Sequence, residues 1–307
     1  MSDTGAVEVW RGTVATWECD GMGHMNVRFH LLRAMQGLAG AAAALGMPHA
    51  FAAHAPATLI VREHHVRFLR EAREGAIQHM TASVVDIGET EALIQLILFD
   101  SISEETCATF LTRVAHAAGR SARPFPWPAR AYAAAEALKA PVAANAGPRS
   151  VPALSSGPTP SLAQAEAMGL TRGGLSVVMP EDCDVFGRLR IEMFMGRLSA
   201  SIGHTINPFR RAAQAAQPGI RMGGAALEYR LVYFAQPHAG DRIDVRAGLV
   251  EVTPKLARIR HWLLDPVTGA PWAEAENIVV NFDLDSRRAV SLSTEAAAQL
   301  QSKVTGR

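Results

Sequence analysis

The sequence predicts an α+β protein made of two copies of one unit, each an antiparallel sheet wrapped around a central helix. Residues 18–29 read ECDGMGHMNVRF and residues 182–194 read DCDVFGRLRIEMF; in both, an Asp precedes a Gly by three positions and a helix-like stretch follows. Residues 63–75 (EHHVRFLREAREG) and 228–240 (EYRLVYFAQPHAG) form a second matching pair. The offsets are 184 − 20 = 164 and 228 − 63 = 165 residues, and a nearly constant offset indicates an internal duplication.

The order of elements in the first half supports this architecture. A β-like run at 7–16 precedes a predicted helix at 26–45, in which apolar residues recur every three or four positions. This helix is apolar almost all round, so we expect most of its surface to be buried. Alternating patterns and turn residues then predict four strands, at 59–69, 77–85, 92–99 and 106–114.

The second half repeats this order around a predicted helix at 190–204. Its predicted strands lie at 175–179, 227–233, 243–247, 256–264 and 273–282. The stretch between the halves is rich in Ala, Pro, Ser and Gly, which is typical of a linker, and we expect a short helix in it at 129–138. The predicted organisation is an N-terminal domain at 1–116, a linker at 117–170 and a C-terminal domain at 171–307.

Composition and charge exclude several classes of protein. Apolar residues make up 49% of the chain and charged residues 19%, which is typical of a globular protein. The 30 basic and 29 acidic side chains argue against a nucleic-acid partner, and the apolar runs are too short to span a membrane. Cys19, Cys107 and Cys183 lack the spacing of a zinc site or a disulfide framework, so we expect no metal and a reducing, cytoplasmic location.

A motif at 17–29, WECDGMGHMNVRF, resembles the signature of the hotdog-fold acyl-CoA thioesterases, the 4-hydroxybenzoyl-CoA thioesterase-like group. It is also similar to acyl-carrier-protein thioesterases, some of which fuse two hotdogs in one chain. The resemblance places Asp20 on the loop carboxylate of the family, Gly23 and His24 on its Gly-His pair, and Asn26 on its Asn. It implies a tandem hotdog fold and hydrolysis of an acyl thioester.

The second copy of the motif departs from the family pattern. Asp184 and Gly187 match, but Arg188 stands in place of the His and Arg190 in place of the Asn. Asp184 is either a second active site or a remnant of the duplication that only preserves the loop shape. A neighbouring guanidinium such as Arg188 would make this carboxylate a weaker base but could attract an anionic ligand.

The chemistry of a thioester explains why these residue types are candidates. Attack on its carbonyl requires a base or nucleophile, together with a donor for the developing negative charge on oxygen. Asp20 can attack the carbonyl or activate water, and the first amides of the following helix, which lack internal partners, can polarise it. Gly21 and Gly23 would allow the backbone to approach the substrate closely. No cofactor is needed, and coenzyme A enters only as part of the substrate.

Each candidate also has a structural interpretation. Asp20 or Asn26 could cap the helix, and His24 could orient the loop rather than take part in the reaction. Arg67 could meet the phosphates of coenzyme A, or it could belong to a solvated strand edge. His64 and His65 are neighbours on a strand, where side chains alternate between faces, so only one of them can face the pocket.

The predicted partner is a small-molecule acyl thioester, and further pairing into a homo-oligomer is compatible with the fold. Two other functions remain open. One is an enoyl-thioester hydratase or dehydratase, although the Asp-x-Asn-Pro-x-His run of such enzymes does not occur in this sequence. The other is a non-catalytic module that binds acyl thioesters, because fold alone does not determine function. The acyl group, and the choice between coenzyme A and a carrier protein, also remain open.

Overall fold

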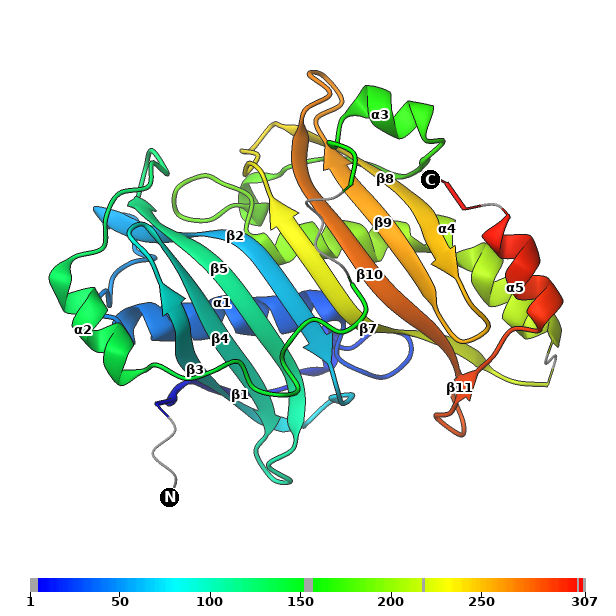
Figure 1. Cartoon of the computed structure of the whole chain (residues 1–307), viewed down its shortest axis with the longest axis horizontal. Helices are drawn as coiled ribbons and strands as arrows, with labels where there is room; N and C mark the ends of the chain where they lie inside the picture. The colour runs from blue at the N-terminus through cyan, green and yellow to red at the C-terminus, as the bar shows by residue number, and fades with distance from the viewer. Residues whose placement is uncertain (1–4, 152–156, 217–218, 303, 306–307) are drawn as a thin grey trace. The chain divides into compact units, whose positions relative to one another are not determined.

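The computed structural model describes residues 5–151, 157–216, 219–302 and 304–305. These residues fall into two units, each with its own dense internal contacts (Figure 1). Unit 1 comprises residues 1–147 and 183–192, and unit 2 comprises residues 148–182 and 193–307. The loop that carries Asp184 therefore belongs to unit 1.

Unit 1 contains an antiparallel sheet with one long helix against one face (Figure 1). The described strands follow the order β1-β3-β4-β5-β2 across the sheet. The helix is α1 (Val27–Ala44), and a 3-10 turn, η1 (Thr16–Glu18), precedes it. The strands are β1 (Val7–Thr13), β2 (Ala57–Phe68), β3 (Ile77–Ile87), β4 (Glu91–Asp100) and β5 (Thr106–Ala118).

The sheet of unit 2 has the same connectivity. Its described strands follow the order β6-β8-β9-β10-β7, with the short β11 (Ala289–Val290) paired to β10. The 3-10 turn η3 (Pro180–Asp182) follows its first strand, and the long helix α4 (Ile191–Ala216) begins after the Asp184 loop. The strands are β6 (Thr171–Val177), β7 (Met222–Tyr233), β8 (Arg242–Val252), β9 (Ala257–Leu264) and β10 (Pro271–Asp283).

Strand, 3-10 turn, helix and four further antiparallel strands thus occur twice in the same order. This confirms the α+β tandem hotdog that the sequence predicts. Three more helices are described: α2 (Ala129–Ala137), α3 (Leu162–Ala167) and α5 (Thr294–Gln301). Of these, the sequence predicted only α2.

Helix α1 is buried along one face and half-buried over most of the rest, with Gln36, Ala43 and Ala44 exposed, which agrees with the expectation that most of its surface is covered. The buried positions recur every three or four residues, as in an ordinary amphipathic helix, and are His30, Leu31, Arg33, Ala34, Gly37, Leu38, Ala41 and Ala42. A side chain at Gly40 would place its Cβ 2.5 Å from the Val9 carbonyl oxygen, so glycine lets β1 lie directly on the helix. The alanines of the outer face reflect helix propensity rather than burial.

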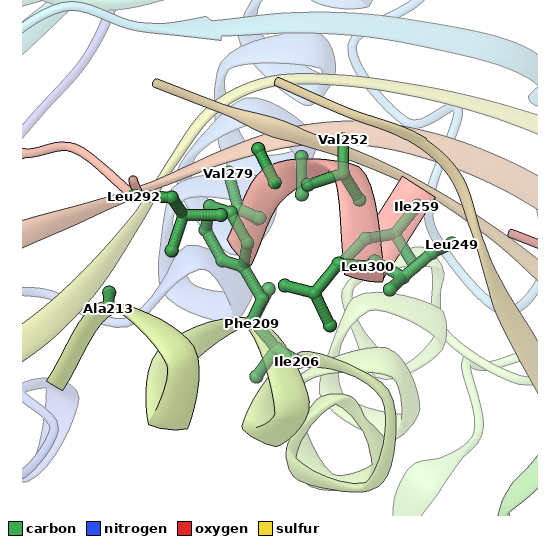
Figure 2. Close-up of a cluster of buried hydrophobic side chains, with 11 residues drawn as sticks. Ile206, Phe209, Ala213, Leu249, Val252, Ile259, Val279, Leu292 and Leu300 are labelled. Carbon is green, nitrogen blue, oxygen red and sulfur yellow. The ribbon is translucent and has the colours of Figure 1, made fainter. Parts of the chain in front are cut away.

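Helix α4 is longer than the predicted 190–204 segment, because it continues through Pro208. A proline inside a helix removes one backbone hydrogen bond and normally favours a break. Here Ile206, Phe209 and Ala213 lie on one side of α4 and pack into an apolar cluster with strands β8 to β10 and helix α5 (Figure 2). Burial of this apolar stripe offsets the cost of the proline.

Strand β6 also differs from its prediction at 175–179. It begins earlier, at Thr171, and ends at Val177, before the turn that starts at Pro180. The pairing with β8 shifts register between Arg172 and Gly174, so the first part of the strand contains a bulge. Consecutive glycines weaken the strand signal in the sequence, and a bulge explains why glycine is tolerated there.

The apolar cluster around α4 gives a test of how the helix is held. Substitution Phe209→Ala removes a side chain that is 1% exposed and should lower the free energy of unfolding by about 3–5 kcal/mol. The exposed Arg211 is a matched control on the same helix, and Arg211→Ala should change it by less than about 0.5 kcal/mol. Urea unfolding followed by circular dichroism measures both. Equal midpoints for the two variants would contradict this packing.

Candidate active site

The segment between η1 and α1 folds into a closed loop around Asp20. Cys19 and Met25 form an isolated antiparallel bridge, and the Asp20 N–H donates to the His24 carbonyl at 3.0 Å. The Gly23 N–H donates back to the Asp20 carbonyl at 2.9 Å. Gly23 has φ +76°, a left-handed conformation that favours glycine. The predicted Gly23 is therefore required by the backbone of the loop.

Asn26, not Asp20, caps helix α1. The Asn26 Oδ1 accepts a hydrogen bond from the Arg28 N–H at 3.0 Å, and the Asn26 carbonyl accepts from the Phe29 N–H at 2.9 Å. The Asn26 N–H itself donates to the Glu18 carbonyl at 2.9 Å. This is the standard geometry of a helix N-cap, so the structural interpretation accounts for Asn26, while its predicted catalytic role stays a prediction.

One oxygen of the Asp20 carboxylate accepts a hydrogen bond from the loop, and the other lies near His24. Its Oδ1 accepts from the Met22 N–H at 2.8 Å, which fixes the side chain within the loop. Its Oδ2 lies 3.6 Å from His24 Nε2. The side chain is 24% exposed, against 15% for His24. Asp20 is thus held by the loop, and its side chain remains partly exposed.

A second histidine lies deeper behind the loop. His30, on α1, is buried and meets the Phe68 ring edge-on at a centroid distance of 5.0 Å. Burial lowers the pKa of His30 to about 3, with smaller contributions from His24 and Arg33. His30 is therefore neutral near pH 7, and it adds no positive charge beside Asp20.

The Asp184 loop has the same backbone but a different electrostatic environment. The Asp184 N–H donates to the Arg188 carbonyl at 2.7 Å, the Gly187 N–H donates to the Asp184 carbonyl at 3.0 Å, and Gly187 has φ +80°. The Asp184 Oδ1 accepts from the N–H groups of Phe186 at 2.8 Å and Arg188 at 3.0 Å. Its Oδ2 lies 3.3 Å from Arg188 Nε, so this carboxylate is committed to loop donors on both oxygens.

Arg67 and Gly21 are predicted binding residues that are not among the partners of Asp20 and Asp184 in the hydrogen bonds given above. Phe68 contacts His30 of α1, and because strand side chains alternate between faces, Arg67 projects from the opposite face of β2. The same alternation places His64 on the face that Phe68 occupies. A Cβ added at Gly21 would meet nothing within 4 Å, so no close backbone approach requires glycine there.

A buried ion pair lies next to the Asp20 loop, and the Asp-Gly-His motif does not predict it. Arg33 on α1 pairs with Glu18 of η1, and the second half has a counterpart in Arg197 and Asp182. The signal was available in the sequence, since 182 − 18 and 197 − 33 both equal 164, the offset of the duplicated motif. The offset alone does not show that Arg33 turns toward Glu18, because that contact depends on how the helix packs against the turn.

The described residues contain no group of three or more His, Cys, Asp and Glu side chains that could hold a metal ion. In the same part of the chain, no helix has the length and apolar character needed to cross a membrane.

A tandem hotdog with an acidic loop ahead of each central helix defines a thioesterase-type architecture. The chain belongs to the thioesterase-like superfamily, whose family model matches residues 14–139 and 178–300. Both copies of the motif lie inside the matched segments. No curated protein matches the chain in sequence.

Two solved structures share the fold over nearly the whole chain. An acyl-ACP thioesterase from Bacteroides thetaiotaomicron superimposes with a TM-score of 0.64 at 10% identity, covering 91% of this chain and 100% of that one. The 12:0-ACP thioesterase from Umbellularia californica gives a TM-score of 0.64 at 10% identity, covering 90% and 94%. At these identities the likeness establishes the shared tandem fold.

The capping role of Asn26 can be tested directly. Asn26→Ala should lower the free energy of unfolding by about 1 kcal/mol, because the Arg28 N–H loses its acceptor. Asn26→Ser supplies another good capping oxygen and should retain most of the stability. Thermal unfolding measures both variants. Loss of hydrolysis by a fully stable Asn26→Ser protein would show that the amide does more than cap the helix.

Proposed function

We propose that this protein hydrolyses acyl thioesters, with Asp20 as the general base or the nucleophile. One observation carries the proposal: Asn26 caps α1, so the partly exposed Asp20 side chain does not serve as the cap and keeps one oxygen near His24. A carboxylate held by its own loop at the entrance to the central helix is a candidate to attack a bound carbonyl or to activate water. Membership of the thioesterase-like superfamily supports the same reaction class.

Hydrolysis forms a bond from oxygen to the carbonyl carbon and breaks the bond from that carbon to sulfur. As a base, Asp20 takes a proton from the attacking water; as a nucleophile, it forms an anhydride that water then opens. The leaving thiolate gains a proton, and the products are a carboxylic acid and a free thiol. His24 Nε2 lies 3.6 Å from Asp20 Oδ2, and its role in this proposal is to help orient the carboxylate.

The N-terminus of α1 offers a donor for the carbonyl oxygen. The Met25 N–H donates to the Ala72 carbonyl and the Asn26 N–H to the Glu18 carbonyl, and the N–H groups of Arg28 and Phe29 donate to Asn26. Among the described residues, this leaves the Val27 N–H, at the positive end of the helix dipole, for the oxygen that develops charge. The sequence suggested several helix amides for this role, but the amides of Arg28 and Phe29 already donate to Asn26.

We further propose coenzyme A as the thiol carrier, with Arg67 and Arg188 as candidate contacts for substrate anions. Arg188 Nη1 is buried and has no hydrogen-bond partner in the described part of the chain, which favours an anion there. Acyl carrier protein is the second candidate carrier, because two structural neighbours that cover nearly the whole chain are named as ACP thioesterases. Gly21 contributes open space beside Asp20 for either carrier.

Substitution of the loop carboxylates tests the catalytic assignment. Asp20→Asn should lower kcat by at least about 100-fold, since the amide is neither a base nor a nucleophile. The fold should survive, because the amide oxygen can still accept from the Met22 N–H. Asp184→Asn is the matched substitution in the twin loop, and its kcat should stay well above that of Asp20→Asn. Release of free thiol measures turnover, and near-normal turnover by Asp20→Asn would reject the assignment.

The carrier is identified by presenting the same acyl groups on two thiols. A panel of aliphatic and aromatic acyl groups on coenzyme A should release thiol, at rates that differ with the length and shape of the acyl group. Matched acyl carrier protein thioesters provide the comparison, and preference for them would move the proposal to the second carrier. Absorbance of enoyl substrates reports hydration in parallel. Hydration without thiol release would replace the hydrolase with a hydratase.

A further inference from the structure

A buried ion pair joins the turn before the Asp20 loop to the central helix. Arg33 Nη2 lies 2.6 Å from both carboxylate oxygens of Glu18. The Glu18 and Arg33 side chains are only 6% and 8% exposed. Water and salt screen such a pair weakly, and loss of either partner leaves an uncompensated charge in the interior.

The groups around this pair tie three elements together. The Glu18 Oε2 also accepts from the Ala15 N–H at 2.8 Å, which closes the 3-10 turn. Arg33 Nη2 lies 3.4 Å from the Thr13 carbonyl of β1, and the Arg33 guanidinium stacks over the Trp10 ring at 4.7 Å. The pair therefore fixes the turn against both the strand and the helix.

The same turn anchors both ends of the loop that carries Asp20. The Glu18 carbonyl accepts from the N–H of Asn26, the residue that caps α1. The bridge between Cys19 and Met25 continues this closure toward Asp20. Asp20 lies two residues beyond Glu18, so a displacement of the turn is transmitted to its carboxylate through the short closed loop.

The second half contains a counterpart of this arrangement. Arg197 Nη2 lies 2.6 Å from Asp182 Oδ2 and 3.4 Å from the Val177 carbonyl. The Asp182 Oδ2 also accepts from the Met179 N–H at 3.2 Å. These four residues lie 164 positions after Arg33, Glu18, Thr13 and Ala15. The arrangement thus recurs ahead of a loop whose carboxylate is committed to its own donors.

We propose that the Glu18–Arg33 ion pair is a positioning device for Asp20, which sets the catalytic carboxylate against the acyl carbonyl without touching the substrate. The inference rests on the proposed thioesterase function. A buried ion pair is weak as a source of net stability, because desolvation cancels most of the attraction. Its value is geometric, since a misplacement of about 1 Å in a reacting group can cost about 100-fold in rate.

The test separates turnover from stability by measuring kcat per folded molecule. Glu18→Gln can keep an acceptor for the Ala15 N–H but removes the negative charge that holds Arg33. We expect kcat to fall 10- to 100-fold while KM changes less than threefold. Glu18→Asp should restore kcat to within about threefold of the native protein, because an aspartate pairs with the arginine in the second half.

Two further variants keep the test decisive if a lone buried Arg33 prevents folding. The double substitution Glu18→Gln with Arg33→Met removes both charges, and it should show the same loss of kcat as Glu18→Gln without an unpaired cation. Asp182→Asn breaks the counterpart in the second half. It should lower the melting temperature in the same way but leave kcat within about twofold of the native protein.

The outcomes are distinguishable from failure of the proposed function. An inactive Asp20→Asn protein with native kcat in Glu18→Gln would overturn the positioning role and leave the hydrolase assignment standing. Equal losses of kcat in Asp182→Asn and Glu18→Gln would also overturn it, because the effect would then be general. Full activity of Asp20→Asn would instead remove the function on which the inference rests.

Discussion

Burial of one face of the central helix against its sheet is the constraint on which the rest of unit 1 depends. Leu31, Ala34 and Leu38 are fully buried, and Gly40 lets the first strand lie directly on the helix. A helix fixed this firmly along its length has a fixed N-terminus. The loop that enters it therefore has a defined position, which a catalytic carboxylate requires.

The duplication shows how one backbone can hold two different electrostatic environments. Both loops share the same two backbone hydrogen bonds and a glycine with positive φ three residues after the Asp. A histidine faces Asp20 at 3.6 Å, whereas the Arg188 guanidinium and two loop amides engage Asp184. Backbone geometry is thus common to the two repeats, and the residue four positions after each carboxylate sets its electrostatic environment.

Asn26 and Asp20 have different hydrogen-bonding roles in the first loop, which explains why the acidic side chain does not cap the helix. Asn26 satisfies the Arg28 amide, and the Met22 amide satisfies one oxygen of Asp20. The capping amide is thus satisfied by Asn26, and the second oxygen of Asp20 lies near His24. Neutral His30 behind the loop adds no competing charge, because burial holds its pKa at about 3.

The sequence by itself determined the duplication, the order of elements along the chain and the loop that carries Asp20, because apolar periodicity and repeated motifs are sequence signals; the resemblance of the motif at 17–29 implied the tandem hotdog. Only the tertiary structure decided three other matters. Packing of Ile206 and Phe209 carries α4 past Pro208, where local propensity predicts an end. Strand alternation places Arg67 opposite the helix-facing side, and the Glu18–Arg33 contact joins residues 15 positions apart. Such contacts depend on which groups the fold brings together in a desolvated interior, and no local pattern records that.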